Sequence, residues 1–269
     1  MAIQPTQPQG IGGVLDTAFQ LYKASLGMVW PICLLLSICA SPPSIYLLMS
    51  GASGGGPGGA AEMLAAMSDP VYWLIYVVSL ALIMWAVGAL YLKQYSIGVD
   101  AEMTVGTALQ TSLGRLVPLL VMVLLFSIAL MVGLVLLIIP GLILMVSLML
   151  STNLVMFEGK GPVDALTGSH KLVWGNWWRT AGILTVGSIL VMVIYMAVAL
   201  VIGLATPFIG LGVADFVMYS LISGLLVGVF MNLLVMPFFS ALLISVYWDL
   251  KLRKEGGDLA ARVGALNAA

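Results

Sequence analysis

Long runs of uncharged, largely apolar residues dominate the sequence. Five stretches contain no Asp, Glu, Lys or Arg: Ala24–Ala61, Pro70–Leu92, Leu116–Phe157, Thr180–Ala214 and Phe216–Trp248. A helix needs about 20 apolar residues to cross the hydrocarbon core of a bilayer, so each stretch is long enough for one span. The third is long enough for two, and Pro140-Gly141 lies where a tight turn would divide it. We therefore expect an all-α polytopic membrane protein with a single membrane domain, 1–269, and six transmembrane helices, near 30–50, 71–92, 116–138, 141–157, 181–204 and 219–248.

A second pattern, with apolar residues three and four positions apart, occupies three segments near 11–23, 104–114 and 163–174. Each carries an alanine followed by a bulky apolar residue on that face: Ala18-Phe19, Ala108-Leu109 and Ala165-Leu166. This spacing predicts short interfacial amphipathic helices, which lie in the plane of the membrane surface. Each precedes an odd-numbered span, which predicts three repeats of one interfacial helix followed by a transmembrane hairpin. The alternative that any connector beside a membrane looks amphipathic stays open.

The charged residues are few and unevenly placed. Apolar residues make up 62% of the 269 positions and charged residues 8%, against roughly 45–50% and about 25% in soluble domains. On the six-span map all ten Lys and Arg residues fall on one side, and the opposite loops carry only Glu62, Asp69 and Asp215. The positive-inside rule makes the basic side cytoplasmic, with the N- and C-termini on it. The glycine-rich residues 51–62 then form a flexible outer loop.

Candidate chemistry is sparse. The single histidine, His170, has no partners at metal-ligand spacing. Cys33 and Cys39 fall inside the first span, where thiols behave as small hydrophobes. We predict no catalytic residue, no cofactor and no metal site. The sequence shows no glycine-rich phosphate loop for a nucleotide and no basic soluble domain for nucleic acid, so no nucleic-acid partner is expected. Prolines at 42, 43 and 237 interrupt the first and last spans, where they either frame a transport site or only shape the bundle.

Aromatic and basic residues gather at the predicted cytoplasmic ends of the last two spans. Aromatic rings prefer the headgroup level and basic side chains reach toward phosphates. The cluster predicts contacts to lipid headgroups or to a partner, made by Lys171, Trp174, Trp178, Arg179, Lys251, Arg253 and Lys254. Tyr247-Trp248 is interpreted as a marker of depth in the membrane. Beyond it we expect the helix to continue to Gly256-Gly257, with Asp249 paired to Lys251 or Arg253 and a carboxylate of the 158–164 segment anchoring Arg253.

Several motifs resemble those of a bacterial membrane-protein family. They are Ile139-Pro140-Gly141, Phe157-Glu158-Gly159, Gly175–Arg179 (GNWWR) and Ser245–Leu259 (SVYWDLKLRKEGGDL). The family is labelled "glycerophosphoryl diester phosphodiesterase, membrane domain", and here Trp248 replaces a tyrosine and Gly257 an aromatic residue. The resemblance implies the bacterial cytoplasmic (inner) membrane. It also implies that this chain corresponds to the membrane part of such proteins alone. We expect no phosphodiesterase activity, because a chain with one histidine and no strand pattern cannot form the catalytic barrel.

Three functions stay open. The first is a non-enzymatic integral membrane scaffold or accessory protein that contacts lipids or a partner through its cytoplasmic face. The second is a carrier or permeability factor for a lipid or apolar small molecule, and the third is a lipid-active enzyme that uses Asp249 or Glu158. Membrane lipids are the expected partners, with another membrane protein or a homo-oligomer as further candidates. A closed bundle favours the first function, a cavity open to one leaflet the second, and a polar cleft with several carboxylates the third.

Overall fold

The computed structural model describes residues 2–50, 59–205 and 216–267, and within these ranges the chain forms helices and no strand. Six segments are long and apolar enough to cross a membrane: Ile11–Leu47, Pro70–Gly98, Leu116–Leu136, Ile138–Glu158, Trp177–Ala205 and Ser223–Lys254. The predicted all-α class with six candidate spans is therefore confirmed. Of the predicted outer loop 51–62, residues 51–58 lie outside the described residues, and the rest begin a helix.

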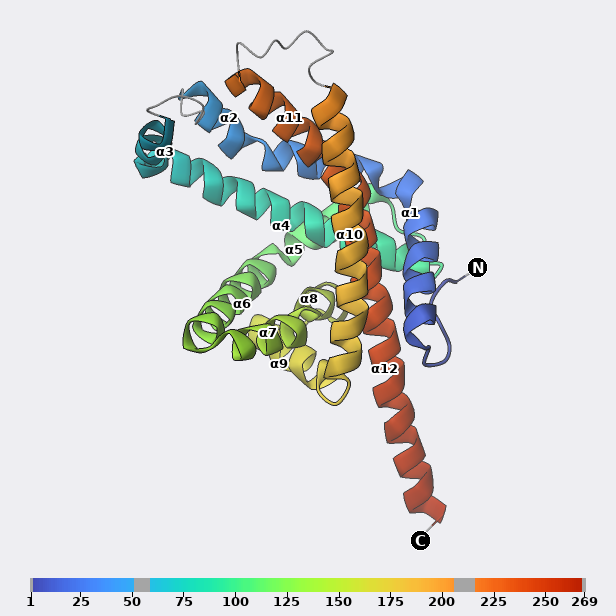
Figure 1. Ribbon diagram of the computed structural model, residues 1–269. Coiled ribbons are helices and arrows are strands. Elements are labelled where there is room, and N and C mark those ends of the chain that lie inside the picture. Colours follow the sequence, from blue (N-terminus) through green and yellow to red (C-terminus); the bar gives the residue numbers. More distant parts are fainter. Residues whose placement is uncertain (1, 51–58, 206–215, 268–269) are drawn as a thin grey trace.

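The first pair of spans consists of α1 (Ile11–Ala40), which α2 (Pro42–Met49) extends, and α4 (Pro70–Gly98), with α3 (Gly59–Ser68) between them. Asp69 caps α4, because its Oδ1 accepts from the N–H of Val71 at 2.9 Å. The amphipathic segment 11–23 is not a separate helix but the beginning of α1, which changes direction along its length (Figure 1). Residues 24–30 contain one glycine and no proline, and Pro31 lies inside the helix without ending it.

The second pair follows α5 (Val105–Gly114), which confirms a helix in the segment 104–114. It comprises α6 (Leu116–Leu136) and α7 (Ile138–Leu148), the latter continued by α8 (Ser151–Glu158). The break between α6 and α7 falls at Leu137, which is extended, and the prediction of a turn at Pro140-Gly141 is wrong. A proline is tolerated in the first turn of a helix, where its missing N–H has no partner to lose. Gly141 instead lets α7 approach α6, because a side-chain carbon there would collide with Leu134.

The third pair follows α9 (Pro162–Val173), which confirms a helix in the segment 163–174. It consists of α10 (Trp177–Ala205) and of α11 (Phe216–Phe230) with α12 (Met236–Asn267). A π-helical turn, Met231–Val235, joins α11 to α12 immediately before Pro237. The expected stop at Gly256-Gly257 is wrong, since α12 continues through both glycines to Asn267. Good helix formers (Leu259, Ala260, Ala261) follow the glycines and carry the helix onward.

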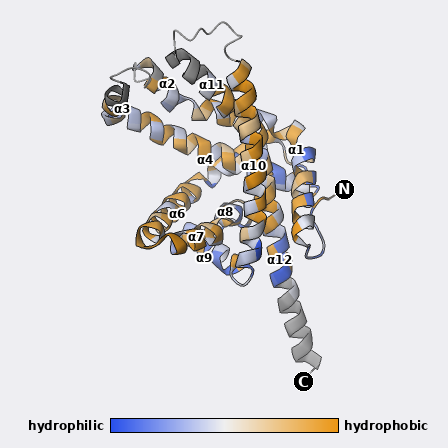
Figure 2. Ribbon diagram, in the orientation of Figure 1, coloured by the Kyte–Doolittle hydropathy of each residue, from blue (hydrophilic) through white to orange (hydrophobic). Residues whose placement is uncertain are grey.

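The core lies where α1, α4 and α12 pack together, and α10 runs beside α12 (Figure 1). The alanine of each amphipathic segment is fully buried: Ala18, Ala108 and Ala165. Apolar residues cover α6, α7 and α10, whereas hydrophilic residues gather at the start of α1, on α9 and along the middle of α12 (Figure 2). Apolar and hydrophilic segments are thus separated, as expected for a membrane protein whose charged residues lie on one side of the bilayer.

Candidate functional site

Three segments that are far apart in the sequence meet at Asp249 on α12. Its side chain is fully buried. The carboxylate Oδ2 accepts from Arg179 Nη1 at 2.5 Å and from Arg253 Nε at 3.0 Å, and Oδ1 accepts from the backbone N–H of Gln9 at 2.8 Å. A buried carboxylate is tolerated when it is paired and hydrogen-bonded, and Asp249 meets both conditions.

Gln9 closes this cluster from the N-terminal side. Its carbonyl oxygen accepts from Arg179 Nη2 at 2.6 Å and from Arg253 Nη2 at 2.5 Å. Its side-chain Oε1 accepts from the hydroxyl of Thr17 at 2.9 Å. We refer to Gln9, Arg179, Asp249 and Arg253 as the arginine clamp. Two guanidinium groups share one carboxylate and one neutral carbonyl, so the clamp keeps an excess positive charge.

The local sequence explains why these groups meet. Arg253 lies one turn beyond Asp249 on the same face of α12, at the i,i+4 spacing that favours ion pairs. Arg179 enters at the start of α10, after the chain reverses at Gly175 with a φ of 95°, a conformation that favours glycine. The predicted Asp249–Arg253 pair is confirmed. The prediction that a carboxylate of the 158–164 segment anchors Arg253 is wrong, because Asp249 on its own helix is the nearer partner.

Lys251 belongs to a second cluster, around Glu158 at the end of α8. Glu158 accepts from the Tyr247 hydroxyl at 2.6 Å, from Lys160 at 2.8 Å and from Lys251 at 3.2 Å. Lys251 is four residues beyond Tyr247, so both face α8, whereas the alternative pair Asp249–Lys251 would need residues two positions apart to share a face. The 158–164 segment is therefore tied to α12, but through Lys251 and Tyr247.

Tyr247 and Trp248 are core residues, and their interpretation as depth markers is wrong. Their side chains are 2% and 1% exposed. The ring of Trp248 packs on Tyr95 and against Gly98 of α4, where an added side-chain carbon would overlap the indole. Helix α4 can approach this closely because Gly98 has no side chain, so the indole fills the space between the two helices.

Four of the predicted contact residues stay on the surface: Lys171, Trp174, Trp178 and Lys254. The indoles of Trp174 and Trp178 are 57% and 84% exposed. Lys254 donates its ammonium to the backbone carbonyl of Lys171, which joins the middle of α12 to the end of α9. We refer to these four residues as the aromatic–basic patch. Arg179, Lys251 and Arg253, by contrast, are engaged by carboxylates.

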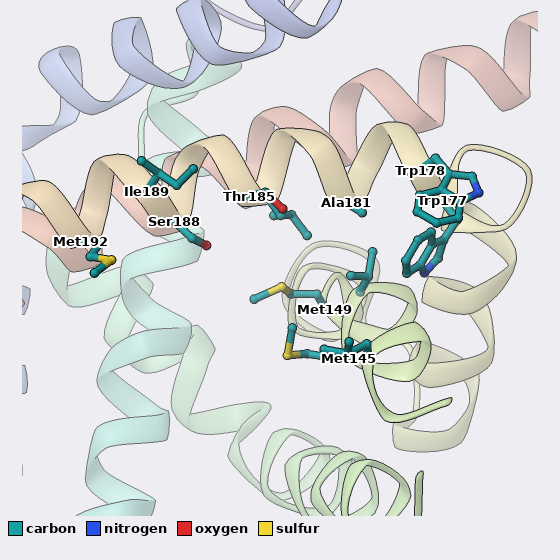
Figure 3. Close-up of a pocket in the computed structure, with 12 residues that line it drawn as sticks. Met145, Met149, Trp177, Trp178, Ala181, Thr185, Ser188, Ile189 and Met192 are labelled. Atoms are coloured by element: carbon teal, nitrogen blue, oxygen red, sulfur yellow. The ribbon is translucent and has the colours of Figure 1, made fainter. Parts of the chain in front are cut away.

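An apolar groove runs beside this patch, between α7 and α10. One part of about 490 Å³ is bordered by two methionines, one in α7 and one just after it, and by one face of α10, with two tryptophans at its end. These residues are Met145, Met149, Ala181, Thr185, Ser188, Trp177 and Trp178 (Figure 3). A second part of about 690 Å³ lies around Trp174 and shares Leu142, Trp177 and Trp178 with the first. Its lining carries no charged side chain, so the α7–α10 groove suits a hydrocarbon chain rather than a charged substrate.

Residues 67–250 match the family described as Domain of unknown function (DUF7847). The chain belongs to this family. No curated protein and no solved structure matches the chain.

The DUF7847 region contains the α7–α10 groove and two members of the arginine clamp, Arg179 and Asp249. Gln9, Arg253 and Lys254 lie outside it. The flanks of the DUF7847 domain therefore complete both the clamp and the aromatic–basic patch. Among the described residues, no three His, Cys, Asp or Glu side chains come together as metal ligands would.

Sequence reasoning missed Gln94, a polar residue in the core of the DUF7847 domain. Its side chain is fully buried, and Nε2 donates to Ser25 at 3.0 Å and to the Pro237 carbonyl at 2.8 Å, while Oε1 accepts from Ser240. It joins α1, α4 and α12 beside the π-helical turn. The predicted span ends at residue 92, so Gln94, which follows Lys93, is placed in the connecting segment. In the structure α4 extends to Gly98 and carries Gln94 into the core.

Proposed function

We propose that this protein is a non-enzymatic integral membrane scaffold that binds an anionic phospholipid at its cytoplasmic face. The headgroup would lie on the aromatic–basic patch, and one acyl chain in the α7–α10 groove. The observation that carries the proposal is the adjacency of the two, since Trp174 and Trp178 belong to the patch and also line the groove. Tryptophan prefers the headgroup level, so the groove would open beside the phosphates.

The headgroup rather than the acyl chain sets the selectivity of such a site. A lipid tail is already in an apolar medium, so its transfer into the groove gains packing but little hydrophobic free energy. Each exposed lysine near an anionic lipid contributes about 1 kcal/mol. Lys171 and Lys254 together thus give a preference of roughly 2 kcal/mol, about 30-fold, for an anionic over a neutral headgroup.

Native mass spectrometry of the detergent-solubilised protein tests this. Phosphatidylglycerol should bind in preference to phosphatidylcholine, and the Lys171→Gln/Lys254→Gln variant should lose that preference. Lys23→Gln, which neutralises an exposed lysine on α1, is the matched control and should keep it. Equal binding of both lipids to the unmodified protein would refute the proposal.

A second candidate, a lipid carrier, is favoured by the π-helical turn before Pro237, since broken helices can frame a transport path. Flipping of fluorescent phospholipid in vesicles that contain the protein would support it over a scaffold. A lipid-active enzyme is less favoured, because Asp249 is fully buried in the clamp and Glu158 pairs with two lysines.

The proposed location is the bacterial cytoplasmic membrane, with both termini in the cytoplasm. Two sequence features support it: the resemblance to the membrane domain labelled glycerophosphoryl diester phosphodiesterase, and the placement of all Lys and Arg residues on one side of the six-span map. In the structure, contacts join several of the segments assigned to that side. Gln9 meets Arg179 and Arg253, and Lys254 meets Lys171.

A further inference from the structure

We propose that Arg179 and Arg253 form a phosphate-binding site, which the backbone carbonyl of Gln9 occupies in this structure. The two guanidinium groups converge on one point, because each donates through Nη2 to the same carbonyl oxygen, at 2.6 Å and 2.5 Å. Paired arginines that converge on one oxygen are a common way of holding a phosphate group. This site shares no residue with the aromatic–basic patch and does not depend on the lipid proposed for the groove.

The charge of the clamp fits an anion better than it fits the carbonyl. Asp249 neutralises one guanidinium, and the remaining positive charge faces an uncharged acceptor. A phosphate oxygen would make charge-assisted hydrogen bonds, roughly twice as strong as those to a neutral carbonyl. Each guanidinium also carries N–H groups beyond the two that it uses here, and the additional oxygens of a phosphate would accept from them. Asp249 would stay in place as the anchor that aligns both arginines.

The segment that covers the site is held by few contacts. Residues 2–9, here called the N-terminal strap, form no helix, and none of them is buried. Beyond the clamp, the strap is held by the N–H groups of Ile3 and Gln4, which donate to the Gly98 carbonyl at 2.8 Å and 3.0 Å. The bond from Thr17 and the partly buried side chain of Ile3, which packs against the core, add to these contacts. Its release would expose Arg179 and Arg253, whose side chains are already 18% and 30% exposed.

An incoming phosphate would therefore displace the strap from the clamp. The same chemistry is offered by a phospholipid headgroup at the membrane surface and by a soluble phosphate. Binding from either source would be linked to a conformational change at the N-terminus, because the carbonyl and the phosphate compete for the same N–H groups.

Hydrogen–deuterium exchange of residues 2–9 in the full-length protein tests the site. In neutral detergent, inorganic phosphate should speed exchange of the strap amides several-fold relative to chloride at equal ionic strength. A second arm uses phosphatidylcholine nanodiscs with and without phosphatidic acid. Faster exchange in the nanodisc arm alone would assign a lipid headgroup as the source, and faster exchange in the detergent arm would assign phosphate itself.

Two variants and a control sharpen the result. Arg253→Gln should abolish the response to phosphate, whereas Lys23→Gln, which removes an exposed charge that is not part of the clamp, should keep it. Thr17→Val removes only the bond to the Gln9 side chain, so it should enlarge the response at lower phosphate. It decides the matter even if Arg253→Gln does not fold. The proposal would be overturned if exchange is unchanged or slower both on adding inorganic phosphate in detergent and on including phosphatidic acid in the nanodiscs. A Thr17→Val response equal to that of the unmodified protein would also overturn it.

Discussion

Replacing Asp249 by Asn should be among the most destabilising single-atom changes in this protein. The substitution keeps the shape of the side chain but removes the charge that both guanidinium groups share. Breaking a buried ion pair by neutralising one partner costs about 3–5 kcal/mol, because the other charge is left uncompensated. Arg179 and Arg253 are 18% and 30% exposed, and water screens part of that charge, so the lower end of about 3 kcal/mol applies.

For a chain of this size about 1 kcal/mol corresponds to roughly 2–4 °C in the unfolding midpoint. Asp249→Asn should therefore lower the midpoint in detergent by roughly 6–12 °C, as measured by intrinsic fluorescence. Arg253→Ala should follow the same direction, and Lys254→Ala, which removes an exposed ammonium, should change it by less than about 3 °C. A shift for Asp249→Asn no larger than that for Lys254→Ala would refute the clamp as a stabilising centre.

Three other perturbations test separate parts of the structure. Gly98→Ala should destabilise the protein by about 1–3 kcal/mol, because the added carbon would collide with the indole of Trp248. Gly114→Ala is the control and should not destabilise it, because nothing lies within 4 Å of the added carbon. Unfolding midpoints measure both effects. Gln94→Leu should cost about 1–3 kcal/mol in the same assay, because it removes three buried hydrogen bonds, to Ser25, Ser240 and the Pro237 carbonyl. In intact cells, a cysteine replacing Asp69 should react with an impermeant thiol reagent, and one replacing Lys160 should not; the reverse pattern would invert the topology.

The helices were predictable because hydropathy and helix length are properties of contiguous sequence. The same holds for the Asp249–Arg253 pair, whose spacing on one helix places them together. The partners of Arg179 and Lys251 were not predictable, because they depend on which helices pack side by side. Trp178 and Trp248 illustrate the limit: both lie beside charges at the end of a span, yet one is exposed and the other fills a space opened by a glycine.

The central claim, a lipid site at the aromatic–basic patch, is tested most directly by an experimental structure in nanodiscs that contain phosphatidylglycerol. We predict an elongated lipid density in the α7–α10 groove. The phosphate of this lipid should lie within reach of Lys171 and Lys254, and the part of the acyl chain next to the headgroup should lie against Trp178. A groove closed by its own methionines, or filled by a helix of a second copy while lipid is present, would contradict it.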